Sequence, residues 1–102
     1  MAFVFLYVTT SSQKEAERIA KALLEEKLIA CVNILPSISL YRWIGKIEKK
    51  REYILLLKTK EKYSTKIKEE IKKIHSYEIP CITKIKVLPN KEFANWIEKE
   101  VK

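Results

Sequence analysis

The sequence has no aspartate, one glycine, one histidine and two cysteines among its 102 residues. So little glycine, together with only three prolines, argues against long flexible linkers. Two cysteines are too few to staple a small secreted fold, so we expect free thiols in a reducing compartment. Neither a C-x-x-C nor an H-x-x-x-H spacing occurs, which leaves no standard metal-ligand signature. No apolar run approaches the roughly 20 residues that span a bilayer, so we expect no membrane segment.

The apolar start of the chain, Met1 to Thr9, lacks the basic n-region and the small-residue cleavage site of a signal peptide. It is rich in aromatic and β-branched residues, which indicates a first strand instead. Since no export signal is recognised, we expect a cytoplasmic protein.

The charged residues are biased both in type and in position. All thirteen acidic residues are glutamate, and eighteen of the twenty-one cations are lysine. This Lys/Glu bias is seen in hyperthermophile proteins, so we expect a thermostable protein. Residues 46–91 contain fourteen cations and six glutamates, an excess as large as the whole net charge of +8. A basic half can attract nucleic acid or acidic metabolites, but these lysines are interleaved with glutamates, which favours a solvated surface.

The hydrophobic pattern predicts four strands and three helices. The clearest helix begins at the capping-box pair Ser12 and Glu15 and continues with apolar residues at helical spacing to Leu28. Pro36 should break the second strand, and the second helix must end before Pro80. The strands are expected at 3–8, 28–44, 52–58 and 81–88, and the helices at 12–28, at 63–74 and from 89 onward.

This order, β-α-β-β-α-β with an added C-terminal helix, is the ferredoxin-like pattern of an α+β fold, in one domain that spans residues 1–102. The first strand is apolar on both faces, and Ile54 to Leu57 is an unbroken aliphatic run. A sheet with one solvated face should alternate apolar and polar residues. Another copy of the chain is the simplest cover for the second face, so we expect a homo-oligomer.

Three motifs follow one another along the chain: Ala30-Cys31-Val32-Asn33, Tyr41-Arg42-Trp43-Ile44-Gly45 and His75-Ser76-Tyr77-Glu78-Ile79-Pro80. Their combination and spacing resemble the CutA family, over nearly the whole chain. The resemblance implies a tight homotrimer of PII-like architecture, in which the hairpin around Gly45 reaches onto a neighbour. It also implies a non-enzymatic role in the response to divalent cations, notably copper, or in the sensing of a small ligand.

The chain departs from that family pattern at three positions. Ser76 stands where many relatives have proline, Val8 where some have cysteine, and Ile74 where some have a second histidine. Cysteine and histidine are the side chains that make a copper site plausible in relatives, so metal binding transfers less directly to this chain.

Three residues are candidate ligands for copper or another divalent cation: Cys31, His75 and Glu52. A thiolate suits Cu(I) or zinc, and an imidazole and a carboxylate could complete a mixed site. The alternatives are that Cys31 is a small buried hydrophobic residue and that His75 is a structural residue at a helix end. The family pattern further implies a candidate pocket between subunits that contains Lys58 and Tyr77 with Glu52.

Tyr41 and Trp43, near the hairpin tip, are predicted to lie in the subunit interface, because large aromatic residues anchor protein contacts. Stacking on a ligand is the alternative for both.

Two other functions share the predicted topology. An RNA-binding module of the RRM type needs aromatic stacking residues in its central strands, whereas the third strand here is largely aliphatic, so nucleic acid is not an expected partner. A small hydrolase of the acylphosphatase type needs a glycine-rich, arginine-bearing phosphate loop after the first strand. Residues 9–13 are rich in hydroxyl groups instead, and their first role is to cap the helix.

Overall fold

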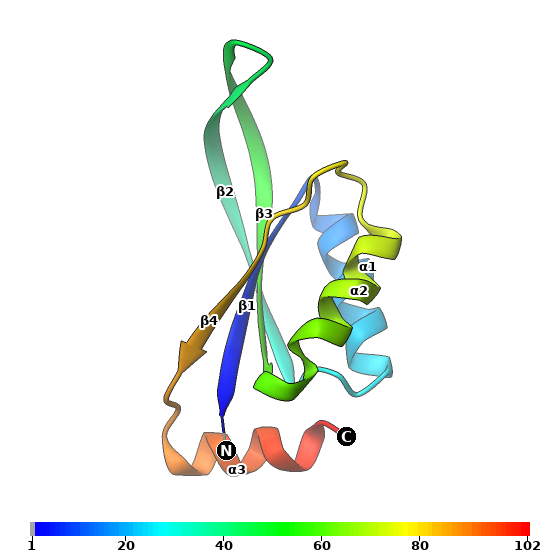
Figure 1. Ribbon diagram of the computed structural model, residues 1–102, viewed down its shortest axis with the longest axis vertical. Coiled ribbons are helices and arrows are strands. Elements are labelled where there is room, and N and C mark those ends of the chain that lie inside the picture. Colours follow the sequence, from blue (N-terminus) through cyan, green and yellow to red (C-terminus); the bar gives the residue numbers. More distant parts are fainter. Residues whose placement is uncertain (1) are drawn as a thin grey trace.

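Four strands form a single antiparallel sheet in the order β2-β3-β1-β4. The structure is a computed structural model that describes residues 2–102. Figure 1 shows the central strands and, at the top of the view, a long hairpin that extends beyond the rest of the sheet. The strands are β1 (Phe3–Thr10), β2 (Cys31–Trp43), β3 (Lys46–Lys60) and β4 (Ile82–Val87).

Two helices, α1 (Gln13–Glu25) and α2 (Ser64–Ile74), lie on the same side of the sheet (Figure 1). A short 3-10 turn, Glu61–Tyr63, leads into α2, and a third helix, α3 (Lys91–Glu100), crosses the end of the sheet where β1 begins. The predicted ferredoxin-like α+β fold with an added C-terminal helix is therefore confirmed. Among residues 2–102, no helix combines the length and the apolar character needed to cross a membrane.

The core lies between the sheet and the two helices. Alternate residues of β1 are buried, as the period of a strand requires for the face that meets the helices. Apolar residues spaced along α1 and α2 meet that face. The central buried side chains are Leu6, Val8, Ile19, Leu23, Leu55, Leu57, Ile67 and Ile71.

Helix α1 begins as the capping pair predicts, with one difference. The Ser12 side chain accepts a 3.1 Å hydrogen bond from the amide of Glu15. The Glu15 carboxylate bonds the Ser11 amide, at 2.9 Å, where a capping box would place it on the Ser12 amide. Glu15 therefore holds the chain one residue before the cap.

The second strand differs from the prediction because Pro36 does not break it. Strand β2 runs through Pro36, whose partner in β3 is Tyr53. Since β2 is one of the two edge strands of the sheet, one of its sides needs no ladder hydrogen bonds, and proline is tolerated there.

The third strand also begins six residues earlier than predicted, at Lys46. The Lys/Glu-rich segment 46–51 has low strand propensity, but the turn at Ile44 and Gly45 places it directly beside β2. Both turn residues have positive φ, 47° and 73°, as a two-residue type I′ hairpin requires. The result is a hairpin paired continuously from Trp43–Lys46 down to Cys31–Lys58.

The face of the sheet opposite α1 and α2 is largely apolar, and its residues come from all four strands. The register places Phe5 beside Ile85 and Leu35 beside Ile54 on this open face. Leu35 and Ile85 are 42% and 43% exposed. Helix α3 approaches only one end of this face, where Lys58 lies 5.4 Å from the Phe93 ring.

Candidate functional site

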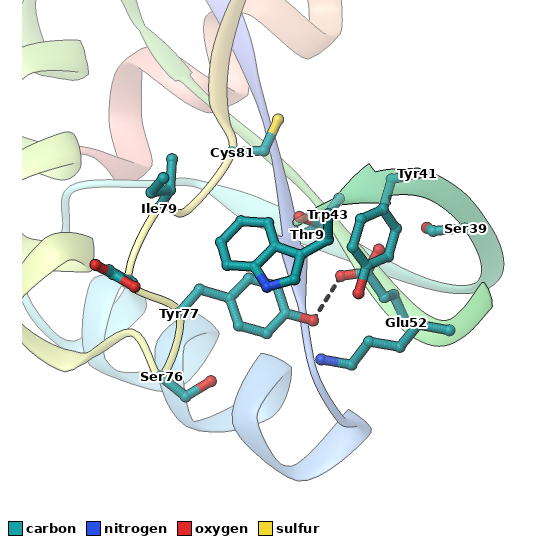
Figure 2. A pocket seen from close by; sticks show the side chains of 11 residues that line it. Thr9, Ser39, Tyr41, Trp43, Glu52, Ser76, Tyr77, Ile79 and Cys81 are labelled. Atoms are coloured by element: carbon teal, nitrogen blue, oxygen red, sulfur yellow. Dashed lines mark hydrogen bonds between the residues drawn. The ribbon is translucent and has the colours of Figure 1, made fainter. Parts of the chain in front are cut away.

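A pocket of about 600 Å³ lies where the hairpin meets the body of the subunit. Its walls come from the β2–β3 hairpin, the end of β1, and the connection between α2 and β4, as Figure 2 shows. The lining combines aromatic rings with charged and hydroxyl groups. The lining includes Thr9, Tyr41, Trp43, Lys50, Glu52 and Tyr77.

A short hydrogen bond joins the loop after α2 to the hairpin across the pocket. The Tyr77 hydroxyl donates a 2.5 Å hydrogen bond to Oε2 of Glu52, drawn as a dashed line in Figure 2. Burial raises the pKa of Tyr77, and the neighbouring Glu52 carboxylate raises it further. Tyr77 therefore stays protonated and remains a hydrogen-bond donor. The Lys50 ammonium lies 4.3 Å from the centre of the Tyr77 ring, within cation–π range.

His75 fixes the connection that carries Tyr77. Its Nε2 donates a 2.8 Å hydrogen bond to the Thr9 carbonyl, and its Nδ1 accepts a 3.0 Å bond from the Tyr77 amide. A carbonyl can only accept and an amide can only donate, so His75 is the neutral Nε2–H tautomer. Both ring nitrogens are thus engaged, and the side chain is fully buried.

Glu15 is the second anchor of this connection. Its carboxylate accepts hydrogen bonds from the Ser11 amide and hydroxyl, both at 2.9 Å, and from the Ser76 amide at 2.8 Å. Burial alone would raise the pKa of Glu15, but the bonds from Ser11 and Ser76 outweigh it and lower the pKa to about 2. The charged carboxylate therefore links the start of α1 to the pocket loop at neutral pH.

The structure does not bring the three predicted metal ligands together within one subunit. Glu52 lies opposite Ser37 in the hairpin, and Cys31 lies six residues further along β2, about 20 Å away at the rise of a strand. His75 would also have to give up two hydrogen bonds to bind a metal. No cluster of three or more potential metal ligands occurs among residues 2–102. The predicted copper site does not fit a single chain and would require a neighbouring subunit.

The predicted pocket pair is likewise separated within the chain. Lys58 faces Cys31 across the ladder, and its ammonium lies 5.3 Å from the Phe5 ring, at the other end of the sheet from Tyr77. Whether subunits unite Lys58 with Tyr77 stays a prediction. Tyr41 and Trp43, 38% and 45% exposed, both line the pocket, and their role in a subunit interface also stays a prediction.

Sequence reasoning misses the contributions of Thr9, Ser39, Lys50 and Cys81 to the pocket. Thr9 belongs to the loop interpreted only as a helix cap, and Lys50 to a charged run expected outside any strand. The register of a longer hairpin is the one signal that could place Ser39 and Lys50 together, since the two are cross-strand partners.

The subunit is thus of the ferredoxin-like class, distinguished by an extended hairpin and by a pocket at its base. The family model described as CutA1 divalent ion tolerance protein matches residues 4–100, and the chain belongs to this family. The "Divalent-cation tolerance protein CutA" of Archaeoglobus fulgidus is 47% identical over 98 residues, which cover 95% of this chain and 96% of that protein. The protein of the same name from Pyrococcus horikoshii is 38% identical and covers 97% of this chain and 98% of its own length.

Solved structures of relatives agree closely with this fold. The Archaeoglobus fulgidus structure has a TM-score of 0.96 at 46% identity and covers 98% of this chain and 99% of its own. CutA1 from Oryza sativa has a TM-score of 0.96 at 30% identity and covers 100% of this chain and 95% of its own. Family membership replaces the RNA-binding and acylphosphatase alternatives as the interpretation of this topology. The Archaeoglobus fulgidus protein is named as periplasmic, so a cytoplasmic location for this chain stays a prediction.

Proposed function

We propose that this chain acts as a homotrimeric, non-catalytic, PII-like protein of divalent-cation tolerance that binds a small ligand in the pocket at the base of the hairpin. The observation that carries this proposal is that hydrogen bonds already hold the polar groups of that pocket in place. The Tyr77–Glu52 hydrogen bond closes one wall, and the buried anchors His75 and Glu15 hold the loop behind it. Fixed polar groups within a mostly apolar concavity are the general signature of a small-molecule site.

The trimer part of the proposal is supported by the open face of the sheet. Its apolar residues on β1, β2, β3 and β4 form one continuous surface, and such patches on soluble proteins mark contact sites. In a closed ring, each subunit would offer its hairpin to the next, so that the pocket would lie near a subunit boundary.

Copper bound directly by the protein is the second candidate. The observation in its favour is that Cys31 is a free, half-buried thiol beside the open face, where a neighbouring subunit could add further ligands. The donors available within one chain do not form a site, so we place the small ligand first.

Native mass spectrometry of protein purified without added metal tests both parts together. We expect a species of about 36 kDa, three times the 12.1 kDa chain, with any retained mass that of an organic molecule. A monomer at micromolar concentration would contradict the trimer. Copper retained in stoichiometric amount through the purification would favour the second candidate over the first.

A further inference from the structure

We propose that the ligand of this pocket is an organic cation, a small molecule with an ammonium or guanidinium group attached to an apolar or aromatic body. This inference rests on the proposed function, since it names the chemical class that the same pocket binds. Three independent features of the pocket point to it: an incompletely paired buried carboxylate, a set of aromatic walls, and a cation from the chain itself.

The carboxylate is that of Glu52, which is 7% exposed although it lines the pocket. Its Oε2 accepts the bond from Tyr77, whereas its Oε1 has no hydrogen-bond partner among residues 2–102 and is not sealed from solvent. Because Oε1 is open to the pocket, it can accept a hydrogen bond from a molecule that enters. A charged donor makes the stronger bond to a carboxylate.

The aromatic walls of the same pocket are the rings of Tyr41, Trp43 and Tyr77, all of which Figure 2 shows. The faces of aromatic rings carry partial negative charge and attract ammonium and guanidinium groups. A bare Mg²⁺ or Ca²⁺ ion would need six or more oxygen ligands, and no cluster of three or more acidic, histidine or cysteine ligands occurs among residues 2–102. The walls suit a cation that also has an apolar surface.

The chain already places one ammonium in this environment, that of Lys50. Its Nζ lies 4.3 Å from the centre of the Tyr77 ring and makes no ion pair among the described residues. Lys50 is a long, flexible side chain that can leave when a ligand enters. We interpret it as an internal substitute for the ligand's cation, which a tighter-binding molecule would displace.

The charges that line the pocket also favour a cationic ligand. The pocket is lined by two carboxylates, Glu52 and Glu78, and by one ammonium, Lys50, whereas the whole chain has a net charge of +8. Most of the surface would attract anions, and this pocket is an acidic exception that selects for cations.

Three probes of similar size and shape test the assignment: phenethylamine, 2-phenylethanol and 3-phenylpropionate. Trp96→Phe leaves Trp43 as the only tryptophan, so its fluorescence reports the pocket of the assembled full-length protein, with calorimetry as the second readout. We expect the amine to bind about tenfold more tightly than the alcohol, the value of a charge-assisted hydrogen bond, and the carboxylate to bind most weakly.

Two variants carry opposite expectations, and each has a neighbour as its control. Glu52→Gln should weaken binding of the amine about tenfold, and Lys50→Gln should strengthen it by removing the competing ammonium. Glu48→Gln and Lys49→Gln change the same charges on the hairpin outside the pocket and should leave binding unchanged.

Each other outcome overturns the inference in a distinguishable way. Preferred binding of 3-phenylpropionate that is lost in Lys50→Gln would make this an anion site, and the proposed ligand pocket would stand. Binding of the amine that Glu52→Gln and Lys50→Gln both leave unchanged would place the cation elsewhere. If no probe binds to a correctly assembled protein, both the inference and the ligand-binding part of the proposed function are wrong.

Discussion

The Glu15 carboxylate and the Ser76 amide lie 2.8 Å apart, although 61 positions separate them in the sequence. This hydrogen bond attaches the loop that carries Tyr77 to the first turn of α1. Because the same carboxylate also bonds Ser11, one buried charge fixes both segments. The geometry of the pocket therefore depends on a residue that does not line it.

Replacing Glu15 with glutamine should destabilise the protein in a pH-dependent way. The pKa of Glu15 is lowered to about 2 from the model-compound value of 4.5, so its charge stabilises the folded state fully above pH 4.5. That contribution, up to about 3 kcal/mol, is lost as the pH falls from 4.5 towards 2. Guanidinium denaturation of wild type and Glu15→Gln should give stabilities that differ most near pH 7 and converge near pH 2. The exposed neighbour variant Glu17→Gln is the control, and a difference independent of pH would contradict the assignment.

The open face should determine assembly. Replacing Ile85 with glutamate introduces a charge on that face and should shift the trimer towards monomers without unfolding the subunit. Leu24→Glu makes the same change at similar exposure, 39% against 43%, but on α1 and away from the open face. Light scattering should show loss of the trimer for Ile85→Glu only. Equal effects of the two variants, or a wild-type monomer, would show that this face is not the interface.

An element of this fold can be predicted where burial gives the local sequence a regular hydrophobic period. It is missed where the element forms only because it pairs with a segment distant in the sequence. The alternation in β1 and the helical spacing in α1 are local signals, and both elements form as expected, although α1 ends at Glu25, three residues before the predicted end at Leu28. The strand character of residues 46–51 depends instead on pairing with β2, which no local propensity reveals. Pro36 is misinterpreted for the same reason, since its tolerance depends on β2 being an edge strand.

The sequence predicts several residues of the candidate site, but it does not predict how these residues are arranged in space. Glu52 and Tyr77 both stand out in the sequence, yet the bond between them depends on the register of the hairpin and on the path of residues 75–81. Cys31 and His75 stand out by their chemistry alone. In the structure Cys31 lies opposite Lys58, whereas His75 bonds Thr9, which is paired with Ile54 further along β3. The ring of His75 makes two hydrogen bonds, one to Thr9, which lies 66 positions earlier in the sequence, and one to Tyr77, which lies two positions later. Only the folded structure shows that these three residues lie together.

The protein should melt above roughly 90 °C, the threshold of a hyperstable protein. The Lys60 ammonium, whose side chain is 7% exposed, pairs with Glu98 at 2.7 Å and ties β3 to α3. Glu70 pairs with both Lys66 and Lys73, at 3.0 and 3.3 Å, on the surface of α2. Lys60→Met should cost about 2 kcal/mol because it leaves a partly buried carboxylate unpaired, whereas Glu70→Gln removes only surface ion pairs and should cost less. Calorimetric melting of the wild type near 55 °C at low salt would contradict the expectation.

Replacing His75 separates a structural role from a metal-binding one. Because both ring nitrogens bond the backbone of Thr9 and Tyr77, His75→Ala should destabilise the protein by about 2 kcal/mol, the cost of leaving buried groups unpaired. We expect calorimetric titration with Cu²⁺ and Zn²⁺ to give the same affinity for His75→Ala as for wild type. Cys31→Ser is the companion variant, since the half-buried thiol is free of a disulfide and its loss should weaken any soft-metal binding. If both variants abolish copper binding while the trimer persists, a neighbouring subunit must complete the site, and His75 must exchange its two hydrogen bonds for the metal.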